Sequence, residues 1–262
     1  MPEFLLVDRP PGQLRVTINR ATKRNPLSRA VLAELDAVFN AHRDDDSLVV
    51  ATITGAGDKA FAAGGDLKEF DALRSAEDAA QLFANAARAL DAIRGFPVPV
   101  VAVLNGTALG GGAELALACD YRVAAAHAHI GFVQNRLAIT TGFGGGCDLF
   151  RLLGPHRAMD VLLRAKVFSA DEAQKLGLID VVATPDAGLD ATLPAFLAPL
   201  LRARPQVVRA VKRQALAELR EATFAERRAT EQTNFIETWI HPDHWTAAAQ
   251  LLADLAPRTR VR

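Results

Sequence analysis

The chain has 262 residues, with 30 lysines and arginines against 30 aspartates and glutamates, so its formal net charge is zero. This length can bury one large core, and the balanced charge excludes a nucleic-acid binder that relies on bulk phosphate attraction. The two cysteines, Cys119 and Cys147, provide neither a cysteine-pair zinc pattern nor a disulfide framework. Prolines and glycines interrupt the uncharged stretch 95–113, which argues against a membrane span. We therefore expect a cytoplasmic protein with no metal, no nucleic-acid partner and no membrane partner.

The first half of the chain predicts alternating strands and helices. Residues 4–7 and 14–19 alternate around a Pro-Pro-Gly turn and predict a β-hairpin. Ser28 is a candidate N-cap for a helix with one apolar face. Ser75 and Asp78 have the spacing of a capping box at the start of another helix. Apolar, β-branched runs predict further strands at 48–53, 99–104, 121–125 and 129–133.

The second half changes character along its length. A capping box at Ser169–Glu172 opens a helix that ends before the apolar run 178–182. Strand patterns are absent from the rest of the chain, which predicts consecutive helices, one of them broken at Pro242. The chain is thus expected to divide into an α/β core, residues 1–185, and an all-helical region, residues 186–262.

Three glycine clusters lie among the predicted strands and helices. The cluster at 55–60 fits the loose dinucleotide fingerprint G-x-G-x-x-A, but no helix opens on its glycines, so we set that interpretation aside. The clusters at 61–67 and 105–114 each follow a strand and precede a helical pattern. Backbone N–H groups at two such turns can donate to one carbonyl oxygen and stabilise a developing oxyanion. The alternative is that these glycines form tight turns required only for packing.

Glu114 lies in the first turn of an otherwise apolar predicted helix. Burial among apolar neighbours favours the neutral form of a carboxyl group and suits it to proton transfer near neutral pH. The alternative is an exposed glutamate that the helix dipole stabilises.

The segments Phe61-Ala-Ala-Gly-Gly-Asp-Leu67 and Asn105-Gly-Thr-Ala-Leu-Gly-Gly-Gly-Ala-Glu114 closely resemble the motifs of the crotonase, or enoyl-CoA hydratase/isomerase, superfamily. Further likenesses lie at residues 23–27 and 169–179. The resemblance implies an α/β fold, a crotonase-like spiral of ββα turns with a C-terminal all-helical trimerisation region. It also implies an acyl-CoA ligand, assembly as a homotrimer or a dimer of trimers, and no cofactor beyond the coenzyme A that the substrate carries.

The same resemblance implies a site. By motif match, the backbone N–H groups of Gly65 and Gly111 would form an oxyanion hole for the thioester carbonyl and stabilise an enolate. Glu114 matches the first of the two glutamates that activate water in family hydratases. The second position is Gln134, which can orient a water molecule but cannot exchange a proton at physiological pH. The expected substrate-binding residues are Lys23, Arg24, Ala63, Asp66, Leu67 and Thr107, of which the two basic residues match contacts to coenzyme A phosphates.

The resemblance therefore favours an enzyme that reversibly hydrates 2-enoyl-CoA, with Glu114 as the acid and base. Gln134 leaves three alternatives open, because hydratases and some isomerases use a carboxylate at its position. They are an enoyl-CoA isomerase, a malonyl-type acyl-CoA decarboxylase, and a non-catalytic subunit that binds coenzyme A esters.

Several other polar and aromatic residues are expected to be structural. Asp148, which follows the glycine turn at 144–146, is predicted to be a solvated helix N-cap rather than a second acid. His244 is expected in a surface loop. Trp239 and Trp245 are expected in the core or at a subunit interface.

Overall fold

The computed structural model describes residues 3–218 and 224–254. Its strands are β1 (Leu5–Asp8), β2 (Gln13–Ile18), β3 (Val50–Gly55), β4 (Ala60–Ala62), β5 (Val100–Leu104), β6 (Thr107–Leu109), β7 (Tyr121–Ala124), β8 (His129–Gly131), β9 (Val167–Ser169) and β10 (Val181–Val182). Its helices are α1 (Arg29–Ala41), α2 (Leu67–Phe70), α3 (Ala76–Arg94), α4 (Gly111–Ala118), α5 (Gly145–Arg164), α6 (Ala170–Leu176), α7 (Gly188–Arg202), α8 (Pro205–Glu218), α9 (Phe224–Trp239) and α10 (Pro242–Asp254). Two 3₁₀ helices are η1 (Ala21–Lys23) and η2 (Gln134–Leu137).

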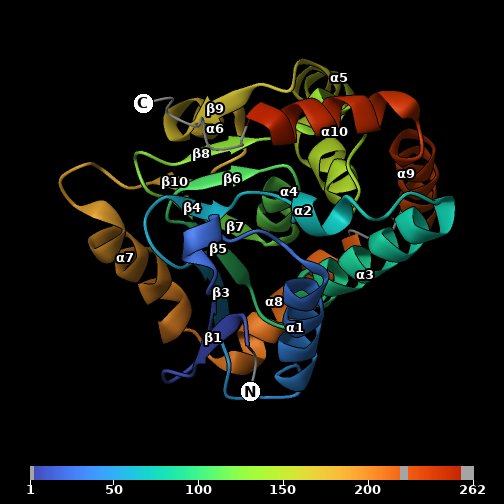
Figure 1. Ribbon diagram of the computed structural model, residues 1–262. Helices are drawn as coiled ribbons and strands as arrows, with labels where there is room; N and C mark the ends of the chain where they lie inside the picture. The colour runs from blue at the N-terminus through green and yellow to red at the C-terminus, as the bar shows by residue number, and fades with distance from the viewer. Residues whose placement is uncertain (1–2, 219–223, 255–262) are drawn as a thin grey trace.

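The strands form two sheets, and from β3 to β8 successive strands of the chain alternate between them. One sheet has six strands in the order β1-β2-β3-β5-β7-β10, and the other has four in the order β4-β6-β8-β9. All neighbours are parallel except the pairs β1–β2 and β8–β9. In this middle part, each turn of the chain places one strand in each sheet before the next helix, as in β5-β6-α4. This topology confirms the expected spiral of ββα turns, with α7 on the side of the sheets opposite α1 and α3 (Figure 1).

The predicted helix starts are confirmed by their capping hydrogen bonds. The Ser28 hydroxyl accepts from the backbone N–H of Val31 at 3.3 Å, at the start of α1. Both bonds of a capping box are present at Ser75 and at Ser169, which open α3 and α6. Local sequence therefore determines where these helices begin.

The sequence patterns missed β4, β6 and β9 and did not predict the extent of α5. Strands of three residues are too short to show alternation, and glycines surround two of them. In α5 the non-helical conformation of Gly154 (φ 74°, ψ 165°), followed by Pro155, interrupts the helical pattern. Of the apolar run 178–182, only the last two residues form a strand, β10.

The helices after β10 pack on the body of the same chain. Lys212 on α8 is only 5% exposed, and its ammonium group donates to Asp120 Oδ2 at 2.6 Å. Phe235 and Trp239 on α9 belong to the main hydrophobic core. The helical region thus shares a core with the sheets, and its separation as a unit from residue 186 onward stays a prediction. Among the described residues, no helix combines the length and apolarity needed to cross a bilayer.

Candidate active site

A cavity of about 1160 Å³ lies where the two glycine turns face the C-terminal helices. Nine of the residues expected at the site line it: Lys23, Arg24, Ala63, Gly65, Asp66, Leu67, Gly111, Glu114 and Gln134. The tenth, Thr107, lines a neighbouring cavity of about 560 Å³. The two cavities share three lining residues, Arg24, Ala63 and Leu109, so they adjoin.

The turn before α4 presents a backbone N–H group to the cavity. Gly111 is the first residue of α4, so its N–H has no acceptor within the helix. Gly64, on the other turn, has φ of +109°, and a Cβ there would lie 3.1 Å from the carbonyl oxygen of Leu109 and 3.9 Å from the nitrogen of Gly111. Glycine at position 64 therefore permits the close approach of the two turns.

The orientation of Gly65 follows from its bridge to Leu27. The N–H of Leu27 donates to Gly64 O at 2.8 Å, and the N–H of Asp66 donates to Leu27 O at 3.3 Å. In a parallel bridge, the residue between these two bonds directs its own N–H to the opposite side. The N–H of Gly65 therefore points away from Leu27. The side chain of Asp66 forms an ion pair with Arg20 at 2.9 Å.

Glu114 is buried, with 1% of its surface exposed, and both oxygens of its carboxylate accept hydrogen bonds. Oε1 accepts from Nε2 of Gln134 at 2.8 Å and from the backbone N–H of Gly142 at 3.3 Å. Oε2 accepts from the backbone N–H groups of Phe143 at 2.7 Å and Gly145 at 2.9 Å. The expected burial is confirmed, and the alternative of an exposed glutamate is wrong. All four donors stabilise the charged carboxylate, which opposes the effect of burial.

Gln134, the first residue of η2, is 8% exposed. Because the charged carboxylate of Glu114 can only accept, the amide must present its NH₂ group to it. The amide oxygen Oε1 is buried and has no hydrogen-bond partner within the described part of the chain. An unsatisfied buried acceptor costs about 1–3 kcal/mol, so this oxygen is suited to accept from a bound ligand or water molecule.

A buried ion pair supports the loop that holds Glu114. Arg94, at the end of α3, donates to Asp148 Oδ2 from Nη2 at 2.6 Å and from Nε at 2.8 Å, and to the carbonyl oxygen of Phe143 at 3.4 Å. A Cβ on Gly144 would lie 3.1 Å from Nη2 of Arg94, so the loop rests directly on the guanidinium group. Asp148 is 2% exposed, and the expected solvated N-cap is therefore wrong. An arginine at a helix C-terminus is ordinary, which is why the sequence did not reveal this role.

The C-terminal helices supply an aromatic wall to the cavity. Trp239 on α9 is 3% exposed, lines the cavity and donates from Nε1 to Leu73 O at 2.7 Å. The predicted core position of Trp239 is confirmed, but no sequence pattern indicated that it lies at the site. His244 is 2% exposed, so the predicted surface loop is wrong. It lies on α10, where its ring packs 4.7 Å from that of Trp239 and its Nδ1 lies 2.8 Å from the carbonyl oxygen of Leu137. Its burial lowers the pKa of His244.

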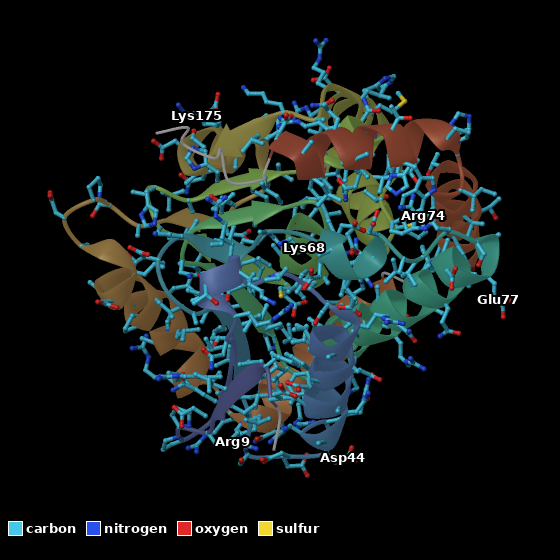
Figure 2. The ribbon with its side chains drawn as sticks, viewed as in Figure 1. Arg9, Asp44, Lys68, Arg74, Glu77 and Lys175 are labelled. Carbon is cyan, nitrogen blue, oxygen red and sulfur yellow. The ribbon has the colours of Figure 1, made fainter. Side chains whose placement is uncertain are left out.

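Basic side chains gather at the side of the cavity formed by η1 and α2. Lys23, Arg24 and Lys68 line it, and Lys68 is labelled on α2 in Figure 2. The adjoining cavity adds Lys59 and His127. Although the whole chain is neutral, this part of the molecule carries the local positive charge that an anionic ligand requires.

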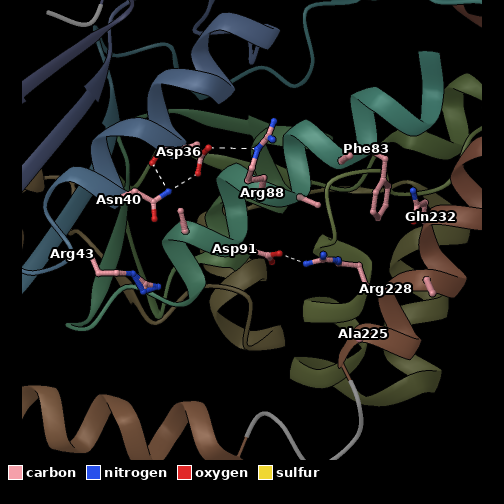
Figure 3. A pocket seen from close by; sticks show the side chains of 13 residues that line it. Asp36, Asn40, Arg43, Phe83, Arg88, Asp91, Ala225, Arg228 and Gln232 are labelled. Atoms are coloured by element: carbon pink, nitrogen blue, oxygen red, sulfur yellow. Dashed lines mark hydrogen bonds and ion pairs between the residues drawn. The ribbon is translucent and has the colours of Figure 1, made fainter. Parts of the chain in front are cut away.

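A further cavity of about 540 Å³ lies between α1, α3 and α9 (Figure 3). Four of its charged side chains form two ion pairs, Asp36 with Arg88 at 3.5 Å and Asp91 with Arg228. Neither glycine turn reaches it. Across residues 3–218 and 224–254, no three histidine, cysteine, aspartate or glutamate side chains are grouped so as to hold a metal ion.

Comparison with known proteins gives consistent matches. The enoyl-CoA hydratase/isomerase family model matches residues 9–249. A crotonyl-CoA hydratase from Syntrophomonas wolfei is 41% identical over 169 residues, which cover 64% of this chain and 65% of that relative. A probable enoyl-CoA hydratase from Rhizobium meliloti is 35% identical over 74% of both chains. The crystal structure of an enoyl-CoA hydratase from Bacillus anthracis matches with a TM-score of 0.79 and 30% identity over 97% of both chains.

Proposed function

The chain belongs to the enoyl-CoA hydratase/isomerase family, and on this premise we propose that it adds water to 2-enoyl-CoA thioesters. The observation that carries the proposal is the buried pair of Glu114 and Gln134, which lines the same cavity as Gly65 and Gly111. Coenzyme A arrives as part of the substrate, and the chemistry needs no separate cofactor.

The two glycine turns bind the thioester oxygen in this proposal. The N–H groups of Gly65 and Gly111 each donate to it, and they gain strength as negative charge develops on that oxygen. Polarisation of the carbonyl makes C3 of the enoyl group electrophilic and stabilises the enolate that follows addition. Loss of one such donor typically costs roughly 3 kcal/mol of barrier stabilisation.

Glu114 and Gln134 hold the water. The water donates one hydrogen bond to Oε1 of Gln134, which lacks a partner, and another to Oε1 of Glu114. At Glu114 it replaces the contact from Gly142, which at 3.3 Å is the longest of the four and lies beyond the usual range for an N–H···O bond. A lone pair of the water oxygen is then free to attack C3.

Glu114 carries the proton through both steps. It accepts a proton from the water as the C3–O bond forms, and the electron pair of the C2–C3 double bond moves toward the thioester oxygen to give an enolate. When the carbonyl re-forms, C2 takes the proton from Glu114. Hydroxyl on C3 and hydrogen on C2 come from the same side of the substrate, so addition is syn. Gln134 orients the water and exchanges no proton.

The remaining parts of the proposal concern binding and assembly. Lys23, Arg24 and Lys68 meet the coenzyme A phosphates, since they form the positively charged side of the cavity. Assembly as a homotrimer or a dimer of trimers is supported by exposed apolar side chains on α5, such as Leu163, which is 69% exposed. We propose a cytoplasmic location, consistent with two buried cysteines that are not joined in a disulfide.

Reaction with crotonyl-CoA in heavy water, followed by mass spectrometry and NMR, tests the activity. We expect one heavy-water addition, with deuterium at C2. The Glu114→Gln variant should lose about 10²–10⁴-fold in turnover, as expected for removal of a general acid–base group, while it still binds crotonyl-CoA. Unchanged turnover would contradict the role of Glu114. Tight binding by the wild type with no addition of water would contradict hydration.

A second reaction is favoured by one observation: four hydrogen bonds already fill the carboxylate of Glu114. Decarboxylation of a malonyl-type ester breaks the bond from Cα to the carboxylate and sends its electron pair into the same enolate. That step needs the oxyanion hole but no water at Glu114. Release of carbon dioxide from malonyl-CoA identifies it. Movement of the double bond without addition of water identifies an isomerase, and binding without reaction identifies a non-catalytic subunit.

A further inference from the structure

We propose that Trp239, together with Phe70 and Phe235, closes the acyl end of the cavity and restricts the substrate to short acyl chains. This inference rests on the proposed function, because it takes the cavity to be an acyl-CoA site. It concerns a wall that comes from the C-terminal helices.

The direction of the acyl chain follows from the charges around the cavity. The coenzyme A phosphates require cations, and three lie together at η1 and on the exposed face of α2, at Lys23, Arg24 and Lys68, while Phe70 lies on the buried face of α2. The other cation in the lining, Arg136 on η2, donates to the carbonyl oxygen of Ala165. With the thioester oxygen at Gly65 and Gly111, the acyl chain extends toward the apolar side. There the cavity is lined by Leu82, Ile139, Phe143, Phe235 and Trp239.

The aromatic side chains lie close to the reacting groups. A Cβ on Gly65 would lie 2.5 Å from the ring of Phe70, and a Cβ on Gly142 would lie 2.4 Å from the ring of Phe235. The ring of Trp239 lies 6.3 Å from that of Phe70 and 5.1 Å from that of Phe235, measured between centroids. These rings therefore form one continuous layer. It begins directly beside Gly65, an oxyanion donor in the proposed function, and Gly142, which donates to Glu114.

The layer is fixed in place by hydrogen bonds to both neighbouring loops. Trp239 donates from Nε1 to Leu73 O at 2.7 Å, on the loop between α2 and α3. The adjacent residue Thr238 accepts from the backbone N–H of Thr140 at 3.2 Å, on the loop between η2 and α5. Because Trp239 is 3% exposed and Phe235 is 2% exposed, a longer acyl chain can be admitted only by displacing packed side chains.

Binding of saturated thioesters tests the wall without any chemical step. Calorimetry compares butyryl-CoA with octanoyl-CoA on the full chain. For the wild type we expect octanoyl-CoA to bind at least about 10-fold more weakly than butyryl-CoA. Each added methylene normally increases affinity, but a closed pocket has no room for the longer chain. In Trp239→Ala the space of the indole becomes available, and octanoyl-CoA should bind at least about 10-fold more tightly than it does to the wild type.

Trp245 provides a matched control. Its ring lies 5.6 Å from that of Trp239 and under Arg74, which Figure 2 labels, but Trp245 is not among the residues that line the cavity. Trp245→Ala should leave the ratio of the two affinities unchanged. If Trp239→Ala does not fold, Trp239→Phe, which keeps a ring of smaller size, should shift the ratio in the same direction by a smaller factor.

The outcomes separate this inference from the proposed function. The proposal that Trp239 closes the pocket is wrong if the wild type binds octanoyl-CoA as tightly as butyryl-CoA or more tightly. It is also wrong if both Trp239 variants keep the wild-type ratio of the two affinities. If the wild type discriminates by chain length but adds no water to crotonyl-CoA, the wall stands and hydration fails. If it hydrates four-carbon and eight-carbon enoyl esters equally well, hydration stands and the wall fails.

Discussion

Gln134 occupies the position at which family hydratases carry the second of their two glutamates. Its Nε2 donates to Glu114 at 2.8 Å, so the two side chains are bonded without any shared proton. The amide thereby fixes the direction of its own oxygen, which remains buried without a partner in the described part of the chain. In this arrangement Glu114 alone can change its protonation state during a reaction.

The Gln134→Glu variant should introduce a second ionisation into the reaction. Two carboxylates at this separation cannot both be charged, so Glu at position 134 must stay protonated to donate to Glu114, and its pKa rises. We expect the pH profile of kcat to gain a descending limb at high pH that the wild type lacks. The folded variant then binds more protons than its unfolded chain, so its stability should fall as pH rises above the unfolded pKa of glutamate. Superimposable pH profiles of kcat for variant and wild type would contradict this account.

At the level of elements, the loop 142–145 connects the α3–α5 contact to the active site. Its backbone donates to both oxygens of Glu114, and its carbonyl at Phe143 accepts from Arg94. Arg94 and Asp148, 11% and 2% exposed at their side chains, lie on the other side of this loop. The loop therefore lies between the buried carboxylate of Glu114 and the buried ion pair of Arg94 with Asp148. The orientation of its N–H groups depends on both.

The Asp148→Asn variant should be clearly destabilised. It removes the negative charge beside a buried guanidinium group, although Arg94 retains Asp91 at 3.0 Å. Breaking a buried pair in this way costs about 3 kcal/mol, measurable by urea unfolding. Asp160→Asn is the matched control, because the pair of Asp160 with Arg164 is exposed at both side chains. Its loss should leave the urea midpoint nearly unchanged. Equal effects of the two substitutions would show that the buried pair has no special role.

The junction of α10 with η2 should make stability depend on pH. Burial lowers the pKa of His244, and the nearby positive charge of Arg74 acts in the same direction. Stability is then complete above the pKa of the unfolded histidine and is lost as the pH falls through that value toward the folded pKa. The urea midpoint of the wild type should drop between about pH 8 and about pH 5, and it should drop less in His244→Asn, which has no group that titrates there. An identical decrease in both proteins would assign the pH dependence to other groups.

On the scale of the whole molecule, the C-terminal helices complete the cavity of their own chain. Phe235 and Trp239 line it from α9, and Leu251 and Leu252 line it from α10. The same chain leaves large apolar side chains exposed elsewhere, including Met159 and others on α5. Exposed apolar groups of this kind mark a surface that another protein copy can cover.

Sedimentation equilibrium should therefore find three or six copies of the chain per particle. Met159 and Leu163 are four residues apart and lie on one side of α5, 44% and 69% exposed. The double variant Met159→Glu/Leu163→Glu should reduce the assembly to smaller species without changing the circular dichroism. Lys175→Glu, at an exposed position on α6 that Figure 2 labels, should leave the assembly intact. A wild-type monomer at micromolar concentration would contradict the proposed oligomer.

Sequence patterns predicted the features of this protein that depend on residues close together in the chain. Capping boxes predicted the starts of α3 and α6, and the two glycine turns, the second followed by Glu114, pointed to residues that line one cavity. These signals are readable because a cap, a tight turn or a helix face involves residues only a few positions apart. The apolar residues around Glu114 in its own helix also favoured its burial, with an exposed position left open as the alternative.

Only the tertiary structure showed how that site is completed. Trp239 and its acceptor Leu73 are 166 residues apart, and Arg94 is 54 residues from Asp148. A tryptophan in an amphipathic helix, or an arginine at a helix end, looks the same in the sequence whether it faces a core, a subunit or a substrate. The four donors to Glu114 and the wall at Trp239 exist because folding brings distant segments to one cavity, and no local pattern records which segments will meet there.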